Sequence, residues 1–122
     1  MSSALLLDTN VVIFALQGSA HINSLITNQR LFLSSVTEIE LLSWPLAKSQ
    51  DLRLVKDFVA LSTLIEYFSS LKDQVIQFRR TYNLKLADAF IAATAAQLDF
   101  TLVSADIGFS KLQEINFIKV NL

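Results

Sequence analysis

Short apolar runs alternate along this chain with longer segments in which apolar residues recur every three or four positions. The first pattern is typical of buried strands and the second of helices. It predicts strands over residues 5–7, 31–36, 63–67, 100–104 and 117–120.

Helices are expected in the segments between these strands. The signals that begin or end them are mostly cap residues and the single proline. The pattern predicts helices over 11–16, with Gly18 after the end, over 20–27, and from Thr37 until Trp44 and Pro45. Three further helices are predicted. They run from an N-cap at Asp51 to residue 61, from a cap at Ser69 or Ser70 to Tyr82, and over 86–98.

This alternation predicts an α/β fold with a parallel sheet of four or five strands flanked by helices. The length of 122 residues suits one domain spanning 1–122, and no repeat or linker interrupts it. Hydrophobic residues make up 52% of the chain and charged residues 17%, which leaves apolar surface beyond a core and hints at a partner.

Charge and cysteine content narrow the function classes. A net charge of -1 gives no global attraction for nucleic acid, so any such contact must be local. The lack of cysteine excludes disulfides and cysteine-ligated zinc and is compatible with a reducing cytoplasm. No apolar run approaches the roughly 20 residues of a membrane span, and the first residues make a poor signal peptide. We therefore expect a soluble cytoplasmic protein.

Four carboxylates, Asp8, Glu40, Asp88 and Asp106, lie where apolar runs end or within expected helices. The carboxyl ends of parallel strands share one edge of a sheet, which is where open α/β folds bind ligands. Two unit charges 4 Å apart repel by roughly 4 kcal/mol at an effective dielectric of 20. A hard divalent cation such as Mg²⁺ or Mn²⁺ would resolve that repulsion.

Each acid also has a purely structural interpretation. Asp8 and Asp106 suit helix caps, Asp88 suits the positive end of a helix, and Glu40 suits an exposed helical position. For any one of them that interpretation is the commoner one, but four separate segments with an acid at the same expected edge favour a shared site. Glu38 and Glu40 are about 200° apart around a helix, so only one of the two can face the shared site.

Four sequence blocks carry a resemblance to a known family. They are LLDTNVVI at 6–13, SVTEIELL at 35–42, LADAFIAATA at 86–95 and TLVSAD at 101–106, the last followed by Phe109. In this order they resemble the PIN-domain ribonucleases, specifically the VapC-like toxins of type II toxin-antitoxin systems. The resemblance implies a PIN-like three-layer sandwich and an active enzyme, because none of the four acidic positions is lost.

Resemblance and carboxylate chemistry agree on Mg²⁺- or Mn²⁺-dependent hydrolysis of RNA phosphodiesters. Asp8 and Asp88 are the strongest expected metal ligands. Glu40 would complete the ligand set or help accept a proton, and Asp106 would bind through water or place a second ion. Asn10 and Ser104 are expected to hydrogen-bond and orient these carboxylates. Thr9 suits the same role, and a capping or core role equally well.

The RNA and protein partners are less sharply defined. Arg79, Arg80 and Lys85 precede Asp88 and would anchor the phosphate backbone, although a solvated helix face is the rival interpretation. Trp44 suits base stacking, packing or a partner contact. The resemblance also implies a cognate antitoxin and a toxin homodimer. Candidate contact residues in the early helices are Val12, Phe14, Leu16 and Ile22.

Two other classes remain open at this point. One is a non-catalytic interaction protein that keeps the PIN-like fold. The other is a phosphoacceptor receiver-like signalling domain, which fits less well because Asp8 is followed by Thr9 and Asn10 rather than by a second acid. A haloacid-type phosphatase would likewise need an aspartate where Asn10 stands.

Overall fold

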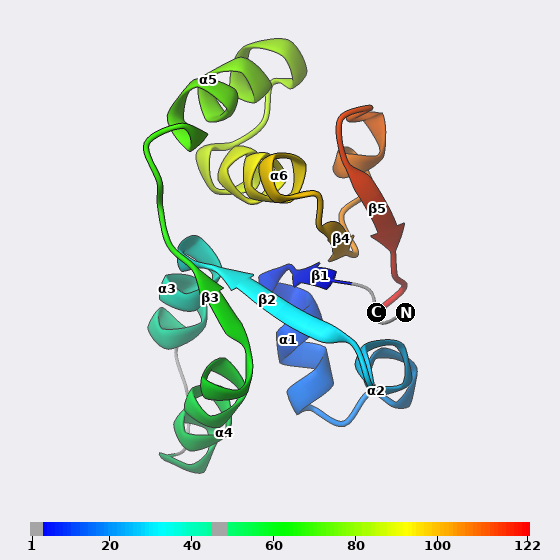
Figure 1. Cartoon of the computed structure of the whole chain (residues 1–122). Helices are drawn as coiled ribbons and strands as arrows, with labels where there is room; N and C mark the ends of the chain where they lie inside the picture. Colours follow the sequence, from blue (N-terminus) through cyan, green and yellow to red (C-terminus); the bar gives the residue numbers. More distant parts are fainter. Residues whose placement is uncertain (1–3, 45–48) are drawn as a thin grey trace.

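The computed structural model describes residues 4–44 and 49–122, and for residues 49 and 50 it describes the backbone alone. Its centre is an all-parallel sheet of five strands in the order β3-β2-β1-β4-β5 (Figure 1). Receiver modules have the strand order 2-1-3-4-5, so the sheet argues against that rival. The strands are β1 (Ala4–Leu7), β2 (Arg30–Ser34), β3 (Thr63–Ile65), β4 (Thr101–Ser104) and β5 (Asn116–Lys119).

Helices cover both faces of this sheet and make three layers, as Figure 1 shows. The predicted fold class is therefore confirmed. One face carries α5 (Leu71–Tyr82) and α6 (Leu86–Leu98), together with the short 3-10 helix η1 (Ile107–Lys111). The other face carries α1 (Thr9–Leu16), α2 (Ala20–Ile26), α3 (Ser35–Ser43) and α4 (Ser49–Leu61).

The continuous apolar run of β1 follows from its central place in the sheet. Successive side chains of a strand point to opposite faces, and here both faces are buried. Leu6 packs with the α5 and α6 layer, whereas Leu5 and Leu7 pack with the α1 to α4 layer. All three are at most 2% exposed. Strands buried on both faces need such unbroken apolar sequence.

Small side chains let α6 lie close to the sheet. Ala89, Ala92 and Ala93 are fully buried in the same core cluster as Leu6 and Leu102. The bounds of α6 coincide with the predicted 86–98. This close packing fixes the position of the first turn of α6, and therefore the position of Asp88, which lies in that turn.

Several predicted boundaries are wrong, and local hydrogen bonds explain the clearest case. β2 ends at Ser34 rather than at 36, because the Ser34 Oγ accepts a hydrogen bond of 3.1 Å from the backbone N–H of Thr37. A capping serine of this kind starts a helix, so α3 begins earlier than expected. Asp51 lies in the first turn of α4 and is not its N-cap.

The remaining differences are smaller. β3 ends at Ile65 rather than at 67. Ser70 occupies the N-cap position of α5 as predicted, but its side chain makes no capping hydrogen bond. The expected break at Pro45 lies outside the described residues. No helix in the described part of the chain is long and apolar enough to cross a membrane.

Candidate functional site

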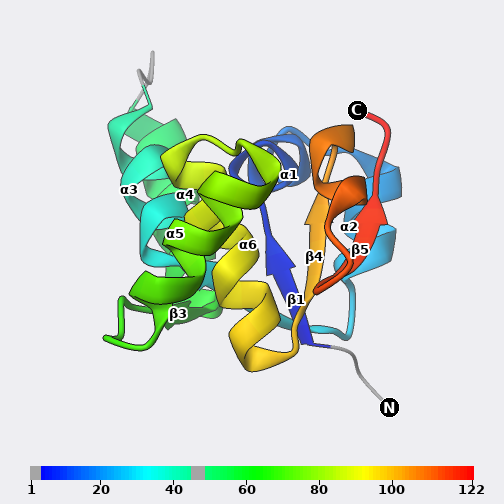
Figure 2. The ribbon, with the colours of Figure 1, turned by 90° about the horizontal axis from the view of Figure 1, so that it is seen from above.

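Asp8 and Asp106 lie at the carboxyl ends of adjacent strands, β1 and β4. The Asp8 Oδ1 accepts a hydrogen bond of 2.8 Å from the Thr9 N–H and caps α1. The Asp106 Oδ1 accepts one of 2.8 Å from the Gly108 N–H at the start of η1. Figure 2 shows both strands running toward the edge at which α6 begins. Capping and site placement are therefore compatible, because each cap uses one carboxylate oxygen and leaves the other for a different partner.

Ser104 joins these two acids. Its hydroxyl donates a hydrogen bond of 2.7 Å to Asp8 Oδ2 and accepts one of 3.0 Å from the backbone N–H of Asp106. The register explains the contact, because Leu7 pairs with Val103 and the next residues of the two strands are neighbours. Ser104 is completely buried, so these bonds hold it in one orientation.

Glu40 reaches the same region from α3. Its Oε1 accepts a hydrogen bond of 2.6 Å from the Thr9 hydroxyl, which places the carboxylate beside the residue that follows Asp8. Helices α1 and α3 pack against each other, which brings the two residues together. The contact is solvent-exposed, so it orients Glu40 without burying its charge.

Asp88 lies in the first turn of α6 and is half-buried. Burial raises the pKa of Asp88 above its ordinary value, and the neighbouring carboxylates of Asp8, Asp106 and Glu40 raise it further. Lys85 partly opposes this increase. The charges of Asp8, Asp106 and Glu40 therefore act on Asp88, although the four acids come from four segments of the chain.

The chemistry of the site suits a hard divalent cation. All four donors are carboxylates, and oxygen ligands of this type are the ones preferred by Mg²⁺ and Mn²⁺. The pKa of Asp88 is raised first by burial and then by the neighbouring negative charges, and a cation would relieve the part that comes from those charges. Within the described ranges, no three acidic, histidine or cysteine side chains are already arranged to hold an ion. Binding an ion would therefore require these carboxylates to change position.

The other predicted site residues take different places. Asn10 is exposed in the first turn of α1, and in the described part of the molecule it makes no hydrogen bond to the four acids. Lys85 occupies the N-cap position of α6 and is exposed. Arg79 and Arg80 are exposed in the last turn of α5.

The two arginines line a hollow of about 310 Å³ at the turn between α5 and α6. Its other lining residues, which were not among the residues expected from the sequence, are Ile76, Asn83 and Leu84. A sequence signal existed, because Ile76 precedes Arg79 and Arg80 by three and four positions and so shares a helix face with them.

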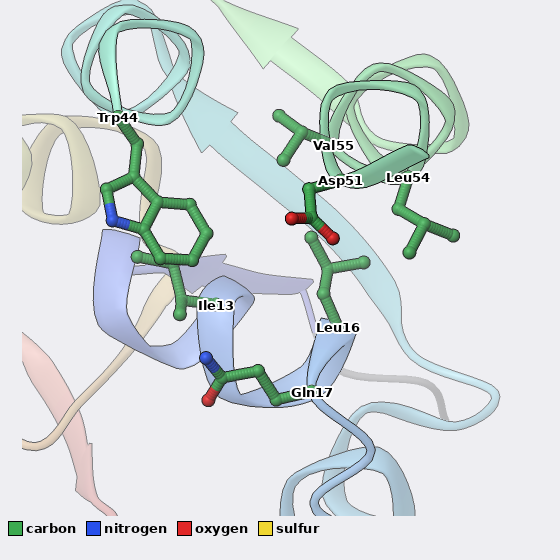
Figure 3. A pocket seen from close by; sticks show the side chains of 7 residues that line it. All are labelled: Ile13, Leu16, Gln17, Trp44, Asp51, Leu54 and Val55. Carbon is green, nitrogen blue, oxygen red and sulfur yellow. The ribbon is translucent and has the colours of Figure 1, made fainter. Parts of the chain in front are cut away.

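A second hollow lies between α1, α4 and the end of α3, as Figure 3 shows. Trp44 is half-buried there beside Ile13 and Val55, and none of the four site acids lines this hollow. Trp44 thus packs near the early helices. The expected contact surface on these helices is wrong for Val12 and Ile22, because both are buried in the core.

Among the solved structures similar to this chain are VapBC complexes and a toxin-antitoxin complex. A chain in the structure of VapBC2 from Rickettsia felis bound to a promoter DNA fragment has a TM-score of 0.83 at 20% identity, covering 97% of this chain and 99% of that one. A chain of DNA-bound VapBC from Salmonella typhimurium has a TM-score of 0.81 at 23% identity, and the match covers 98% of each chain. A chain of a toxin-antitoxin complex from Klebsiella pneumoniae has a TM-score of 0.82 at 20% identity, and the match covers 95% of this chain and 99% of that one.

Two comparisons of the sequence gave different results. No curated protein matches the sequence significantly. The family model of the PIN domain, in contrast, matches residues 5–115, a span that includes all four acids and runs from the second residue of β1 to just before β5. With this match and the shared three-layer fold, the chain belongs to the PIN domain family.

Proposed function

We propose that this protein is a Mg²⁺- or Mn²⁺-dependent endoribonuclease and the toxin of a type II toxin-antitoxin pair. The observation that carries the proposal is that acids from four separate segments gather at one end of the sheet. Ser104 bonds both Asp8 and the backbone of Asp106, and Thr9 bonds Glu40. Burial raises the pKa of Asp88, and the charges of the other three acids raise it further. Such a concentration of like charge is costly for stability, and sites of this kind are typical of function.

In this proposal Asp8 and Asp88 hold the cation, with Glu40 and Asp106 completing the set directly or through water. The bound cation would supply an activated water and neutralise charge on the scissile phosphate. Ser104 keeps Asp8 in one orientation, and Thr9 does the same for Glu40. When water attacks phosphorus, the bond to the leaving oxygen breaks. A carboxylate of the set would accept the proton of the water, and the leaving oxygen would take a proton from solvent. We assign the acceptor role to Glu40, whose carboxylate is exposed.

RNA would be held by cations beside the acids. Lys85 lies three residues before Asp88 and opposes the rise in the pKa of Asp88, which supports a role for Lys85 at a phosphate next to the cleaved bond. Arg79 and Arg80 extend the positive charge along the end of α5. Phosphate contacts of this kind position a nucleic acid without reading its sequence.

The proposal includes a protein partner. The similar structures named above are complexes of toxins with antitoxins, and this chain leaves large apolar side chains exposed. Ile39, next to Glu40, is 62% exposed, and Leu61 at the end of α4 is 87% exposed. Such surface suits a cognate antitoxin and a homodimer. A ribonuclease toxin acts where its RNA substrate is, so we place the protein in the cytoplasm.

The test is RNA cleavage by the purified protein with and without Mn²⁺ or Mg²⁺. Asp8→Asn and Asp88→Asn should each lower cleavage at least about a hundredfold, because each removes a charge from the ion site. Asp73→Asn is the matched control, since Asp73 is exposed on α5. Cleavage that persists in EDTA, or that survives both substitutions, contradicts the metal-dependent mechanism. A folded protein that cuts no RNA favours the non-catalytic interaction protein instead.

A further inference from the structure

The hollow at the turn between α5 and α6 combines apolar and cationic walls. Ile76 and Leu84 provide aliphatic surface, Arg79 and Arg80 provide two guanidinium groups, and Asn83 adds a carboxamide. Its volume of about 310 Å³ is at the lower end of the 300–1,000 Å³ typical of small-molecule sites. The hollow is therefore large enough for one small ligand group rather than for an extended molecule.

Backbone geometry builds this hollow. Ile76, Arg79 and Arg80 lie on one side of α5 because residues three and four apart are neighbours on a helix surface. Asn83 then ends the helix with a left-handed backbone, φ 55°, and turns the chain so that Leu84 lines the same space. Asparagine is one of the few residues besides glycine that adopt this conformation readily.

The polar groups of the hollow are free to bind a ligand. In the described ranges the side chains of Arg79, Arg80 and Asn83 have no hydrogen bond or ion pair with the rest of the protein. A guanidinium binds phosphate through two parallel hydrogen bonds and stacks on a base with its flat face. An amide side chain can pair with the edge of a base. Together these groups match the phosphate and the base of a nucleotide.

The hollow lies close to the acids. Leu84 is four residues before Asp88, so the two Cα atoms are at most about 14 Å apart. Figure 2 shows the α5–α6 turn at the same edge of the sheet as the carboxyl ends of β1 and β4. A strand of RNA bound in the hollow would thus pass the acids within a few nucleotides.

We propose that this hollow is a nucleotide-binding subsite, which holds one nucleotide of a single-stranded RNA within a few nucleotides of the bond that is cut. The inference rests on the proposed ribonuclease function and adds where the substrate is held. The phosphate would bind Arg79 or Arg80, and the base would lie on Ile76 and Leu84 with Asn83 at its edge.

A structural role for the arginines is the main rival. Cations in the last turn of a helix stabilise it by interaction with the helix dipole. That role needs only positive charge, so lysine would serve equally well. A nucleotide subsite needs the planar, two-pronged guanidinium, which lysine lacks. An acidic peptide is the second rival, since it would also bind two arginines.

The first experiment uses nucleotides without a metal ion and so does not depend on catalysis. Uridine and adenosine 5′-monophosphate are titrated into the whole protein in EDTA, with NMR signals of the Ile76 and Leu84 methyl groups and the Asn83 side-chain amide as readout. We expect saturable shifts, larger than those caused by the nucleosides or by inorganic phosphate alone. No shift at these three residues, or equal shifts with a polyglutamate peptide, overturns the subsite.

The second experiment measures affinity for a short single-stranded RNA at several salt concentrations, again in EDTA. Arg79→Gln with Arg80→Gln should weaken binding and reduce the salt slope by about 0.7 for each phosphate that is no longer neutralised. Arg79→Lys with Arg80→Lys should keep the slope but still bind the nucleotides several-fold more weakly. Arg30→Gln is the matched control, because Arg30 is exposed at the first residue of β2, at the opposite edge of the sheet.

The outcomes separate the subsite from the proposed function. Equal nucleotide binding by the lysine pair and the wild type, or equal losses in Arg30→Gln and the glutamine pair, contradicts the subsite whatever the enzyme does. Undiminished cleavage by Asp8→Asn and Asp88→Asn contradicts the metal-dependent ribonuclease and leaves these binding results unaffected.

Discussion

The Ser104 hydroxyl donates a hydrogen bond of 2.7 Å to Oδ2 of Asp8, a residue 96 positions away in the sequence. The same hydroxyl accepts a hydrogen bond from the backbone N–H of Asp106. One buried side chain therefore orients an acid that follows β1 and holds the backbone of the acid that follows β4. Removing it should disturb both acids without removing either charge.

Ser104→Ala tests this link. The substitution leaves a backbone N–H without its partner and frees the Asp8 carboxylate, so we expect a loss of about 1–3 kcal/mol in the free energy of unfolding. Removing an orienting hydrogen bond typically costs about ten- to a hundredfold in metal affinity or activity. Thermal shift with increasing Mn²⁺ and RNA cleavage rates measure the two effects. Ser110→Ala, which removes an exposed hydroxyl in η1, should leave Mn²⁺ affinity unchanged.

Asp88 should make the metal-free protein less stable as the pH rises. Burial and the neighbouring carboxylates raise its pKa in the folded state, whereas the unfolded chain keeps a pKa near the ordinary value of about 3.9. Between these two values the folded state binds more protons, so stability falls as the pH increases through that window and stays lower at neutral pH.

Asp88→Asn should therefore raise the melting temperature of the metal-free protein at pH 7 and flatten its dependence on pH above about 4. Thermal unfolding in EDTA, followed from acidic to slightly alkaline pH, measures this. Asp73→Asn should leave the profile as in the wild type. A lower melting temperature for Asp88→Asn at neutral pH would contradict this, because it would show that the Asp88 carboxylate stabilises the folded protein despite the neighbouring negative charges.

The contact between Thr9 and Glu40 should matter for activity more than for stability. Thr9→Val removes the hydroxyl that holds the Glu40 carboxylate at 2.6 Å. Because the bond is exposed, the free energy of unfolding should change by less than about 1 kcal/mol. If the hydroxyl acts only through Glu40, Thr9→Val should have little further effect in a Glu40→Gln background. Cleavage rates of the two single variants and the double variant decide this, and fully additive losses would refute the coupling.

Close packing of α6 on the sheet leaves no space for larger side chains. Ala92 is completely buried, so Ala92→Leu should destabilise the protein by about 1–3 kcal/mol through overpacking. Urea unfolding at constant pH measures the change. The control is Ala60→Leu on an exposed position of α4, which should remain within about 0.5 kcal/mol of the wild type. Equal effects of the two substitutions would mean that α6 is not tightly packed.

The sequence predicted much of this fold because periodicity reports local burial. The order of strands and helices was correct, and the alanine-rich segment 86–98 coincides with α6. The error at the end of β2 shows the limit of this reasoning. Val36 is apolar and was included in the predicted strand, but the bond from the Thr37 N–H to Ser34 decides where the strand stops. Hydropathy contains no signal for one hydrogen bond.

From the sequence we predicted four acids, which follow apolar runs or lie in expected helices, and one edge of the sheet on which they should gather. The pairing of β1 between β2 and β4, the hydrogen bond between Glu40 and Thr9, and the hollow between α5 and α6 required the tertiary structure. The physical reason is the range of the interactions. Burial pattern and helix propensity act between near neighbours in sequence, whereas strand order, side-chain partners and cavities depend on how distant segments pack.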